Sequence, residues 1–285
     1  MQAASICPTT FAEQHTCGER LAYAWRRALG RCLVSIPLHR WTSPTDLPAG
    51  WRRKSRVRSC EFILPLGNLY LRLQGAPSEV LPARHWLQRE SVIAAALGRD
   101  VQSRPGLRAL DMRLLPGVCL REILLERLPL EAKLEALRVA AAALRQLHGE
   151  SVGEGDGQIR ALTHGDATCN NVVVDRAERS AAWIDFDTRH RAHLSTLERR
   201  ADDLRALLLS SAACLPEHAD ADCAESVLAG YGDEGVVQHL RQSLMRQSRP
   251  TVFHIAQADM AFDRFHNLRR RVVGKCGVRN SECGM

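Results

Sequence analysis

The chain has 285 residues, of which 45% are hydrophobic and 25% charged, and it carries a net charge of +7. This composition is ordinary for a globular protein with one large domain or two small lobes, and no apolar run approaches the roughly 20 residues of a membrane-spanning helix. Because the N-terminus also lacks the basic segment and long apolar core of a secretory signal, we expect a cytoplasmic protein.

The ten cysteines do not form a metal-binding pattern. They are scattered between Cys7 and Cys283, and the sequence contains no CxxC pair. We therefore expect reduced thiols with a structural role.

The positive charge is concentrated at the two ends of the chain. Residues 1–60 contain ten basic and three acidic side chains, residues 261–285 contain six basic and two acidic ones, and the stretch between them is mildly acidic. Basic ends suggest contact with an anionic membrane surface or a phosphorylated glycan, although a solvated basic surface would have the same composition. We interpret 1–60 as a basic N-terminal extension and 261–285 as a basic C-terminal tail, and we do not expect a nucleic-acid partner.

The first predicted element is an amphipathic helix over 18–34, followed by a linker that starts at Thr42 and enters a basic strand. The apolar runs at 62–66 and 68–74 are bounded by glycine, which predicts a hairpin. Alternation in the second run places Arg72 on one face of a strand and the neighbouring leucines on the other.

A helix is predicted over 82–97, because Pro82 suits its first turn and Gly98 its end. An apolar run near 110–115 completes a small sheet-plus-helix lobe over 61–112. The segment 113–260 is mainly helical and starts with a long helix over 128–149. We therefore predict an α+β fold with a small lobe and a larger, mainly helical lobe.

The clearest hairpin joins the runs NVVVD and AAWIDF through a polar turn. His164-Gly165-Asp166 lies just before it, Asn171 follows Asp166 by five residues, and Asp185 follows Asn171 by fourteen. A hairpin of that length brings Asn171 and Asp185 side by side as hard oxygen ligands for Mg²⁺. Asp166 lies one loop away, where a substrate hydroxyl could approach. A proton-accepting carboxylate and a metal site are two requirements of phosphoryl transfer.

This arrangement resembles the catalytic loop and metal-binding segment of the protein-kinase-like superfamily, in which HxDxxxxN is followed by a strand ending in Asp-Phe. The stretch HGDATCNNVVVD…WIDFDTRH…RRADDLRALLLSSA is most similar to the lipopolysaccharide kinase family, which phosphorylates Kdo or heptose sugars. The similarity covers about residues 61–215. It implies a two-lobed kinase-like fold, ATP and Mg²⁺ as cofactors, and a sugar or lipid-linked glycan as acceptor at the inner face of the cell membrane.

The resemblance also implies roles for single residues. Asp166 would accept the proton of the acceptor hydroxyl, Asn171 and Asp185 would hold the metal, and His164 would maintain the shape of the loop. Asp203 resembles the buried helix aspartate that braces the catalytic loop through backbone N–H groups, and Asp202 is the alternative for that position. Asp187 could add a metal ligand or cap the turn that follows it.

The lysine that such kinases carry on a strand has no obvious counterpart. The three lysines are Lys54, in a polar run, and Lys133 and Lys275, both beyond the predicted small lobe. The position that matches is Arg72, and Glu90 follows it on the apolar face of the predicted helix. A carboxylate on an inward face needs a partner, so we predict an Arg72–Glu90 ion pair whose guanidinium contacts the phosphates of the nucleotide.

Two features bear on the alternative functions. No GxGxxG precedes the predicted Arg72 strand, which favours a pseudokinase acting as a nucleotide-binding regulatory module. About a dozen residues separate Asp185 from the next predicted helix, which is short for a peptide platform; even so, a serine/threonine-protein kinase or a small-metabolite (aminoglycoside-type) kinase of the same fold remains an alternative. Arg189, His190 and Arg191 could meet an anionic acceptor or form a solvated turn.

Overall fold

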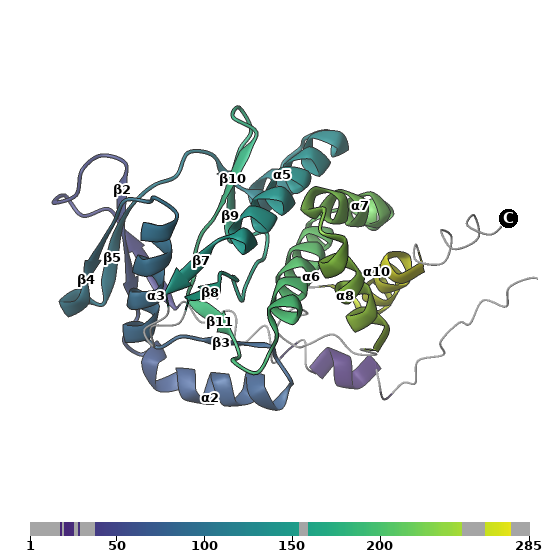
Figure 1. The fold of residues 1–285 in the computed structure, drawn as a ribbon, viewed down its shortest axis with the longest axis horizontal. Coiled ribbons are helices and arrows are strands. Elements are labelled where there is room, and N and C mark those ends of the chain that lie inside the picture. Colours follow the sequence, from purple (N-terminus) through teal and green to yellow (C-terminus); the bar gives the residue numbers. More distant parts are fainter. Residues whose placement is uncertain are drawn as a thin grey trace, which may run out of the picture.

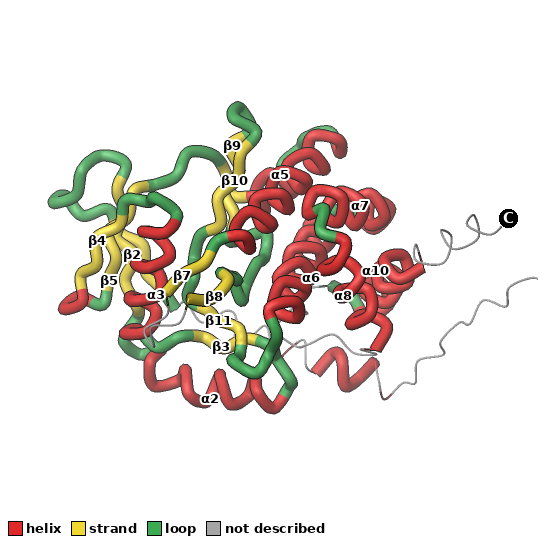
Figure 2. The backbone as a smooth tube through the Cα atoms, viewed as in Figure 1, coloured by secondary structure: helices red, strands yellow, loops and turns green. Residues whose placement is uncertain are grey.

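The structure is a computed structural model that describes residues 38–153, 159–246 and 260–274, together with most residues between 18 and 28. Helices and small antiparallel sheets make up this part of the chain, so the predicted α+β class is confirmed. In Figure 1 the largest sheet lies at one side of the molecule and a group of helices at the other. Figure 2 shows the same division by secondary structure.

The largest sheet has the strand order β1-β2-β5-β4, and all its pairs are antiparallel. Its strands are β1 (His39–Thr42), β2 (Trp51–Arg56), β4 (Val101–Arg104) and β5 (Ala109–Arg113). Helix α3 (Ala83–Ala96) packs on it through a small apolar core that contains Trp86, Leu87 and Leu110. The predicted helix over 82–97 is confirmed, and it ends before Gly98, which has a left-handed φ of 64°.

The predicted boundary at residue 60 lies too far along the chain, because β1 and β2 belong to the same sheet as β4 and β5. The basic run at 51–58 does form a strand, as predicted, but that strand lies between β1 and β5 in the sheet. Lys54 and Arg56 on this strand are buried. Part of the basic excess of residues 1–60 therefore lies inside the fold.

The hairpin predicted over 62–74 is wrong, because these residues form helix α2 (Cys60–Leu73). The helix buries Cys60, Leu64 and Leu71, whose spacing follows the helical period. Leu69 and Leu73, which alternate with Leu71 and seemed to share a strand face with it, are 52% and 74% exposed. Short apolar runs have this ambiguity between helix and strand.

A short ladder connects two distant parts of the chain. Strand β3 (Ser78–Val80) follows α2, and it pairs antiparallel with β11 (Thr188–His190). Asn68 of α2 fixes the end of β3, because its side chain donates to the carbonyl of Val80 (2.8 Å) and accepts from the N–H of Val80 (2.9 Å). The residues after Asp187 are therefore held beside the residues that lead into α3.

The second half of the chain is mainly helical and contains the larger apolar core. The predicted long helix is α5 (Leu130–Gly149), and the predicted hairpin is β9 (Val172–Asp175) with β10 (Ser180–Trp183), so both are confirmed. The other elements are β6 (Val118–Cys119), α4 (Leu120–Leu125), β7 (Ser151–Gly153), β8 (Ile159–Ala161), α6 (Thr196–Cys214), α7 (Asp220–Tyr231), α8 (Glu234–Arg246) and α10 (Phe262–Gly274), with short 3₁₀ turns at Pro105–Leu107 and Glu217–Ala219.

The described residues between 18 and 28 are helical and contact α10. Tyr23 is buried, its hydroxyl donates to the carbonyl of Met260 (2.9 Å), and its ring packs edge-on against Phe262. Arg20 pairs with Asp263 (2.9 Å). Residues near both ends of the chain thus contact each other here, whereas most of residues 1–37 and all of 275–285 in the two basic segments lie outside the described residues. No helix in the described part has both the length and the apolar character needed to cross a membrane.

Candidate active site

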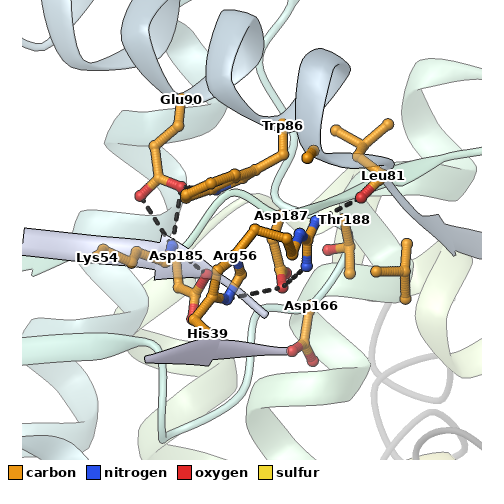
Figure 3. A network of polar contacts seen from close by, with 12 residues as sticks. His39, Lys54, Arg56, Leu81, Trp86, Glu90, Asp166, Asp185, Asp187 and Thr188 are labelled. Atoms are coloured by element: carbon orange, nitrogen blue, oxygen red, sulfur yellow. Dashed lines mark hydrogen bonds and ion pairs between the residues drawn. The ribbon is translucent and has the colours of Figure 1, made fainter. Parts of the chain in front are cut away.

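Lys54 lies at the centre of a buried ion-pair cluster. Its Nζ donates to both carboxylate oxygens of Glu90 (3.2 and 2.9 Å) and to Oδ1 of Asp185 (2.6 Å). The lysine side chain is completely buried, and it reaches the cluster from β2, while Glu90 comes from α3 and Asp185 from the end of the β9–β10 hairpin. Figure 3 shows the three side chains converging.

The predicted Arg72–Glu90 ion pair is wrong. Arg72 lies on the exposed side of α2, and Glu90 bonds to Lys54 and to the indole N–H of Trp86 instead. The premise that Glu90 faces inward and needs a cationic partner is confirmed, since Glu90 is only 6% exposed. The choice of partner failed because residues 60–73 are helical and the sheet begins before residue 60.

The loop that carries Asp166 is braced by Asp203 of α6, as predicted. The two oxygens of the Asp203 carboxylate accept from the backbone N–H groups of His164 (2.7 Å) and Gly165 (2.8 Å). Nε2 of His148 lies 3.0 Å from the same carboxylate. Asp203 is fully buried, so these donors replace the water that a carboxylate would otherwise bind. Asp202 has a different role, since it pairs with His190 and Arg205.

His164 is a structural residue of this loop, again as predicted. Its Nε2 donates to the carbonyl of Ile184 (2.8 Å), which leaves Nδ1 to accept from the backbone N–H of Asp166 (3.2 Å). Burial lowers the pKa of His164 to about 4, so the ring is neutral near pH 7. The histidine thus connects the loop to the strand that leads to Asp185.

Asn171 connects Asp166 to the hairpin. Its side-chain amide donates to the carbonyl oxygen of Asp166 and to Oδ2 of the same residue, both at 2.9 Å. Its own carbonyl accepts from the backbone N–H of Ile184 (2.8 Å), which places Asn171 opposite the residue before Asp185. Because the amide nitrogen faces Asp166, the amide oxygen is the atom through which Asn171 would bind a cation.

Asp185 has a strained backbone, with a φ of 67° in the left-handed region that L-residues rarely adopt. Such conformations cost about 1–3 kcal/mol and are found mainly at functional sites. One ligand atom each from His39, Asp185 and Asp187 lies within 4.8 Å of the other two. Of the two alternatives for Asp187, a metal ligand or a turn cap, this position favours the first, because its carboxylate faces Asp185 rather than the following turn.

The electrostatics of the cluster follow from burial and from close charges. Burial alone would lower the pKa of Lys54, but Asp185 and Glu90 outweigh it, so the net effect is a raised pKa and a charged lysine. Burial would raise the pKa of Asp185, but Lys54 and His39 hold it below its ordinary value. For Asp187, burial and the neighbouring Asp185 raise the pKa well above the ordinary range.

Two further buried residues complete the cluster. His39 of β1 packs on the ring of Trp86 at 4.5 Å between centroids, and burial and Lys54 lower its pKa to about 2. Its Nδ1 lies 3.7 Å from the carboxylate of Asp187. Arg56, two residues after Lys54 on the same strand face, approaches Asp187 at 3.9 Å and donates to the carbonyl of Leu81. Arg56 therefore holds Asp187 against the start of α3 (Figure 3).

Sequence reasoning missed Lys54, His39 and Arg56. One signal could have identified Lys54: only three of the 39 basic residues are lysine, so a lysine within the run WRRKSRVR is unusual in this chain. Strand alternation would then have put Lys54 and Arg56 on one face. His39 lies in a segment without a recognisable pattern.

An apolar cavity of about 130 Å³ opens beside Lys54. Strand residues from both halves of the chain line it, among them Trp41, Met112 and Val173, together with Phe186. Glu90, Lys54 and Asp185 also contribute to its wall. The cavity is therefore apolar over most of its surface, with charged side chains in its wall.

Comparisons with known proteins give no identification. No model of a known protein family matches the chain, and no curated protein matches its sequence.

Replacing Asp203 by asparagine is expected to reduce the free energy of unfolding by about 2–4 kcal/mol, because asparagine has one acceptor oxygen for the three donors and directs N–H groups at them. Urea denaturation of wild type and variant measures this difference. His190 and His148 outweigh burial and hold the pKa of Asp203 below its ordinary value of 3.8. The difference between wild type and variant should therefore be present above pH 3.8 and shrink as the pH falls through the lowered pKa.

The exposed Asp222 of α7 provides a matched control, and Asp222→Asn should change stability by less than about 0.5 kcal/mol. Equal and small effects of the two substitutions would show that Asp203 does not brace the loop.

Proposed function

We propose that this protein is an ATP-dependent phosphotransferase with a two-lobed, protein-kinase-like fold. The observation that carries the proposal is the buried contact of Lys54 with both Glu90 and Asp185. Protein kinases use a strand lysine, held by a helix glutamate beside a metal-binding aspartate, to position the phosphates of ATP. The smaller lobe would then start near β1 and end near β5, rather than span 61–112.

The apolar cavity beside Lys54 is the proposed site of the nucleotide base. Its volume of about 130 Å³ suits one ring system rather than a whole nucleotide, so the ribose and phosphates would extend toward Lys54 and the Asp166 loop. Met112, Leu114 and Leu115 line it along the segment that joins the two halves of the chain. This segment corresponds to the hinge of a kinase-like fold.

Residues of the Asp166 loop would perform the transfer. The acceptor hydroxyl attacks the terminal phosphorus of ATP, the bond to the bridging oxygen breaks, ADP leaves, and Asp166 takes the hydroxyl proton. Asp185 and Asn171, with Asp187 as a further candidate, offer the hard oxygen ligands that suit Mg²⁺. When bound, this ion would supply the positive charge that offsets the charge on the phosphates.

The acceptor is proposed to be a sugar hydroxyl, in accordance with the resemblance to lipopolysaccharide kinases. Helix α6 begins at Thr196, eleven residues after Asp185, and strand β11 occupies part of the interval. This leaves little chain for a platform that would bind an extended peptide. The short segment supports a small or lipid-linked acceptor over a protein.

One observation favours the pseudokinase alternative. The loop between β1 and β2, residues 43–50, contains a single glycine, Gly50, whereas active kinases usually cover the phosphates with a glycine-rich loop. The sequence also showed no obvious counterpart of the kinase strand lysine, but the contacts of Lys54 with Glu90 and Asp185 support that role for Lys54.

The purified chain should bind ATP, and it should convert ATP to ADP in the presence of Mg²⁺ and lipopolysaccharide but not when EDTA is added. Calorimetry measures the first property and a coupled ADP assay the second. Binding without turnover would favour the pseudokinase. A chain that binds no adenine nucleotide, with or without Mg²⁺, would refute the proposed function.

A further inference from the structure

A second and much larger cavity, of about 920 Å³, is lined in part by Arg189 and His190 of β11. Its wall is built from α2, β3, β11, α6 and α8, together with the loop that joins β11 to α6. Its volume is at the upper end of the range for small-molecule sites. Arg72, which the sequence suggested as the phosphate-binding residue of the nucleotide site, lines this cavity instead.

The cavity is strongly basic. Its lining contains three histidines, three acidic residues and six arginines, namely Arg72, Arg160, Arg189, Arg191, Arg199 and Arg205. With neutral histidines the excess is three positive charges in a concave wall. Clefts lined by one sign of charge concentrate ions of the opposite sign, so this cavity favours a ligand with several negative charges.

Ion pairs fix the arginines that lie nearest to β11. The carboxylate of Glu79 accepts from Nε of Arg189 (2.8 Å) and lies 3.7 Å from Nη1 of Arg191. Nε of Arg191 also donates to the carbonyl of Ala76 (3.0 Å), and the Arg191 side chain is only 14% exposed. Two guanidinium groups thus share one carboxylate, which leaves a positively charged surface in a defined position.

The other lining groups narrow the chemistry of the ligand. Among the described residues that line the cavity there is no phenylalanine, tyrosine or tryptophan, so the large aromatic rings on which nucleobases usually stack are absent from its wall. The carboxylates, Gln242 and Ser243 can instead exchange hydrogen bonds with hydroxyl groups. Arginines for phosphates and polar groups for hydroxyls together suit a phosphorylated sugar.

The cavity adjoins the loop that carries Asp166. Gly165 has a φ of 86°, and a Cβ at this position would lie 3.1 Å from the backbone of Arg189. The hydroxyl of Thr188 donates to the carbonyl of His164 (3.3 Å). The wall that holds Arg189 is therefore in direct contact with the loop of the proposed catalytic base.

We infer that this cavity binds the acceptor, and that the acceptor is a sugar that already bears phosphate groups. Its identification as the acceptor site rests on the proposed function, whereas binding of the phosphorylated sugar does not. Arg72 and Arg189 are the best probes, because both are exposed and neither supports the core. Arg176, exposed in the turn between β9 and β10, is a matched control because it is not among the residues that line the cavity.

The experiment measures binding of glucose 1,6-bisphosphate to the full chain by calorimetry, with glucose as the neutral comparison. The wild type should bind the bisphosphate and not glucose, and the affinity should fall as salt is raised. Arg72→Gln and Arg189→Gln should each weaken binding about tenfold or more, the effect of one lost charge-assisted hydrogen bond. Arg176→Gln should leave the affinity unchanged, and all three variants should bind ATP like the wild type.

The outcomes separate this inference from the proposed function. If the chain binds ATP but not the bisphosphate, the inferred sugar-phosphate site is refuted and the proposed phosphotransferase function still stands. If the chain binds the bisphosphate but not ATP, the cavity is a sugar-phosphate site, but it is not the acceptor site of a phosphotransferase. An equal loss in Arg176→Gln means that only the net charge matters, which also overturns the inference.

A second binding experiment, with lipid vesicles, tests whether the phosphate that the cavity binds belongs to a lipid-linked or to a soluble ligand. Phosphatidylcholine vesicles that contain phosphatidic acid present a phosphomonoester on a lipid, and vesicles of phosphatidylcholine alone serve as the control. Binding to the acidic vesicles that glucose 1,6-bisphosphate displaces indicates a lipid-linked acceptor, and binding of the bisphosphate alone indicates a soluble one. Either result supports a phosphate site in this cavity.

Discussion

Lys54→Met should abolish measurable ATP binding and lower the free energy of unfolding by about 3–5 kcal/mol. The substitution leaves the buried Glu90 and the partly buried Asp185 without the ammonium group that compensates their desolvation. Methionine fills a similar volume, so the loss is electrostatic rather than a cavity effect. Urea denaturation and calorimetry with ATP measure the two effects.

Two comparisons make this result specific. Lys133 donates to the carbonyl of Leu124 away from the cluster (2.7 Å), and Lys133→Met should cost about 1 kcal/mol at most without any loss of ATP affinity. Adding Glu90→Gln to Lys54→Met removes one unpaired carboxylate and should restore part of the stability but none of the binding. Arg72→Ala should bind ATP normally. A Lys54→Met protein with wild-type ATP affinity would contradict the assignment of the nucleotide site.

Asp166→Asn should lower Mg²⁺-dependent ATP turnover with lipopolysaccharide by a factor of about 10²–10⁴, the usual contribution of a general base. ATP affinity and stability should change little. Asn171 bonds to the carbonyl of Asp166 as well as to its carboxylate, so the loop keeps one of the two contacts. Turnover under saturating ATP, together with a thermal melt, separates chemistry from folding.

Asp175→Asn is the matched control for this substitution. The Asp175 carboxylate accepts from the N–H groups of Ala177 and Glu178 in the β9–β10 turn, and an asparagine oxygen can do the same. This variant should have wild-type turnover. If Asp166→Asn also retains full turnover, Asp166 is not the base, and the proposed chemistry fails.

The elements that the sequence predicted well are those with strong local signals. The β9–β10 hairpin has two β-branched or aromatic runs around a polar turn, and α5 has a long helical period, so neither needs tertiary information. The bracing role of Asp203 was also predicted, because its position in the helix after the hairpin resembles that of the loop-bracing aspartate in the protein-kinase-like superfamily.

The rest of the site depends on contacts between distant residues. Lys54 is 36 positions from Glu90 and 131 from Asp185, and only the tertiary fold brings the three side chains together. Nothing in the local pattern of residues 51–58 separates a buried strand from a solvated basic run. Helix α2 was mistaken for a hairpin because it contains Pro65 and Gly67, which are poor helix formers. Its leucines give no local signal of which one packs: Leu71 packs with Ala76 and Val80, whereas Leu69 and Leu73 are exposed.

The β3–β11 ladder has a mechanical consequence for the two sites. Strand β3 leads within three residues into α3, the helix of Glu90, and β11 begins one residue after Asp187. Glu79 of β3 also binds Arg189 of β11 across the ladder. Because the ladder joins the two elements, we expect a rotation of α3 that moves Glu90 relative to Lys54 to shift the guanidinium groups in the basic cavity as well.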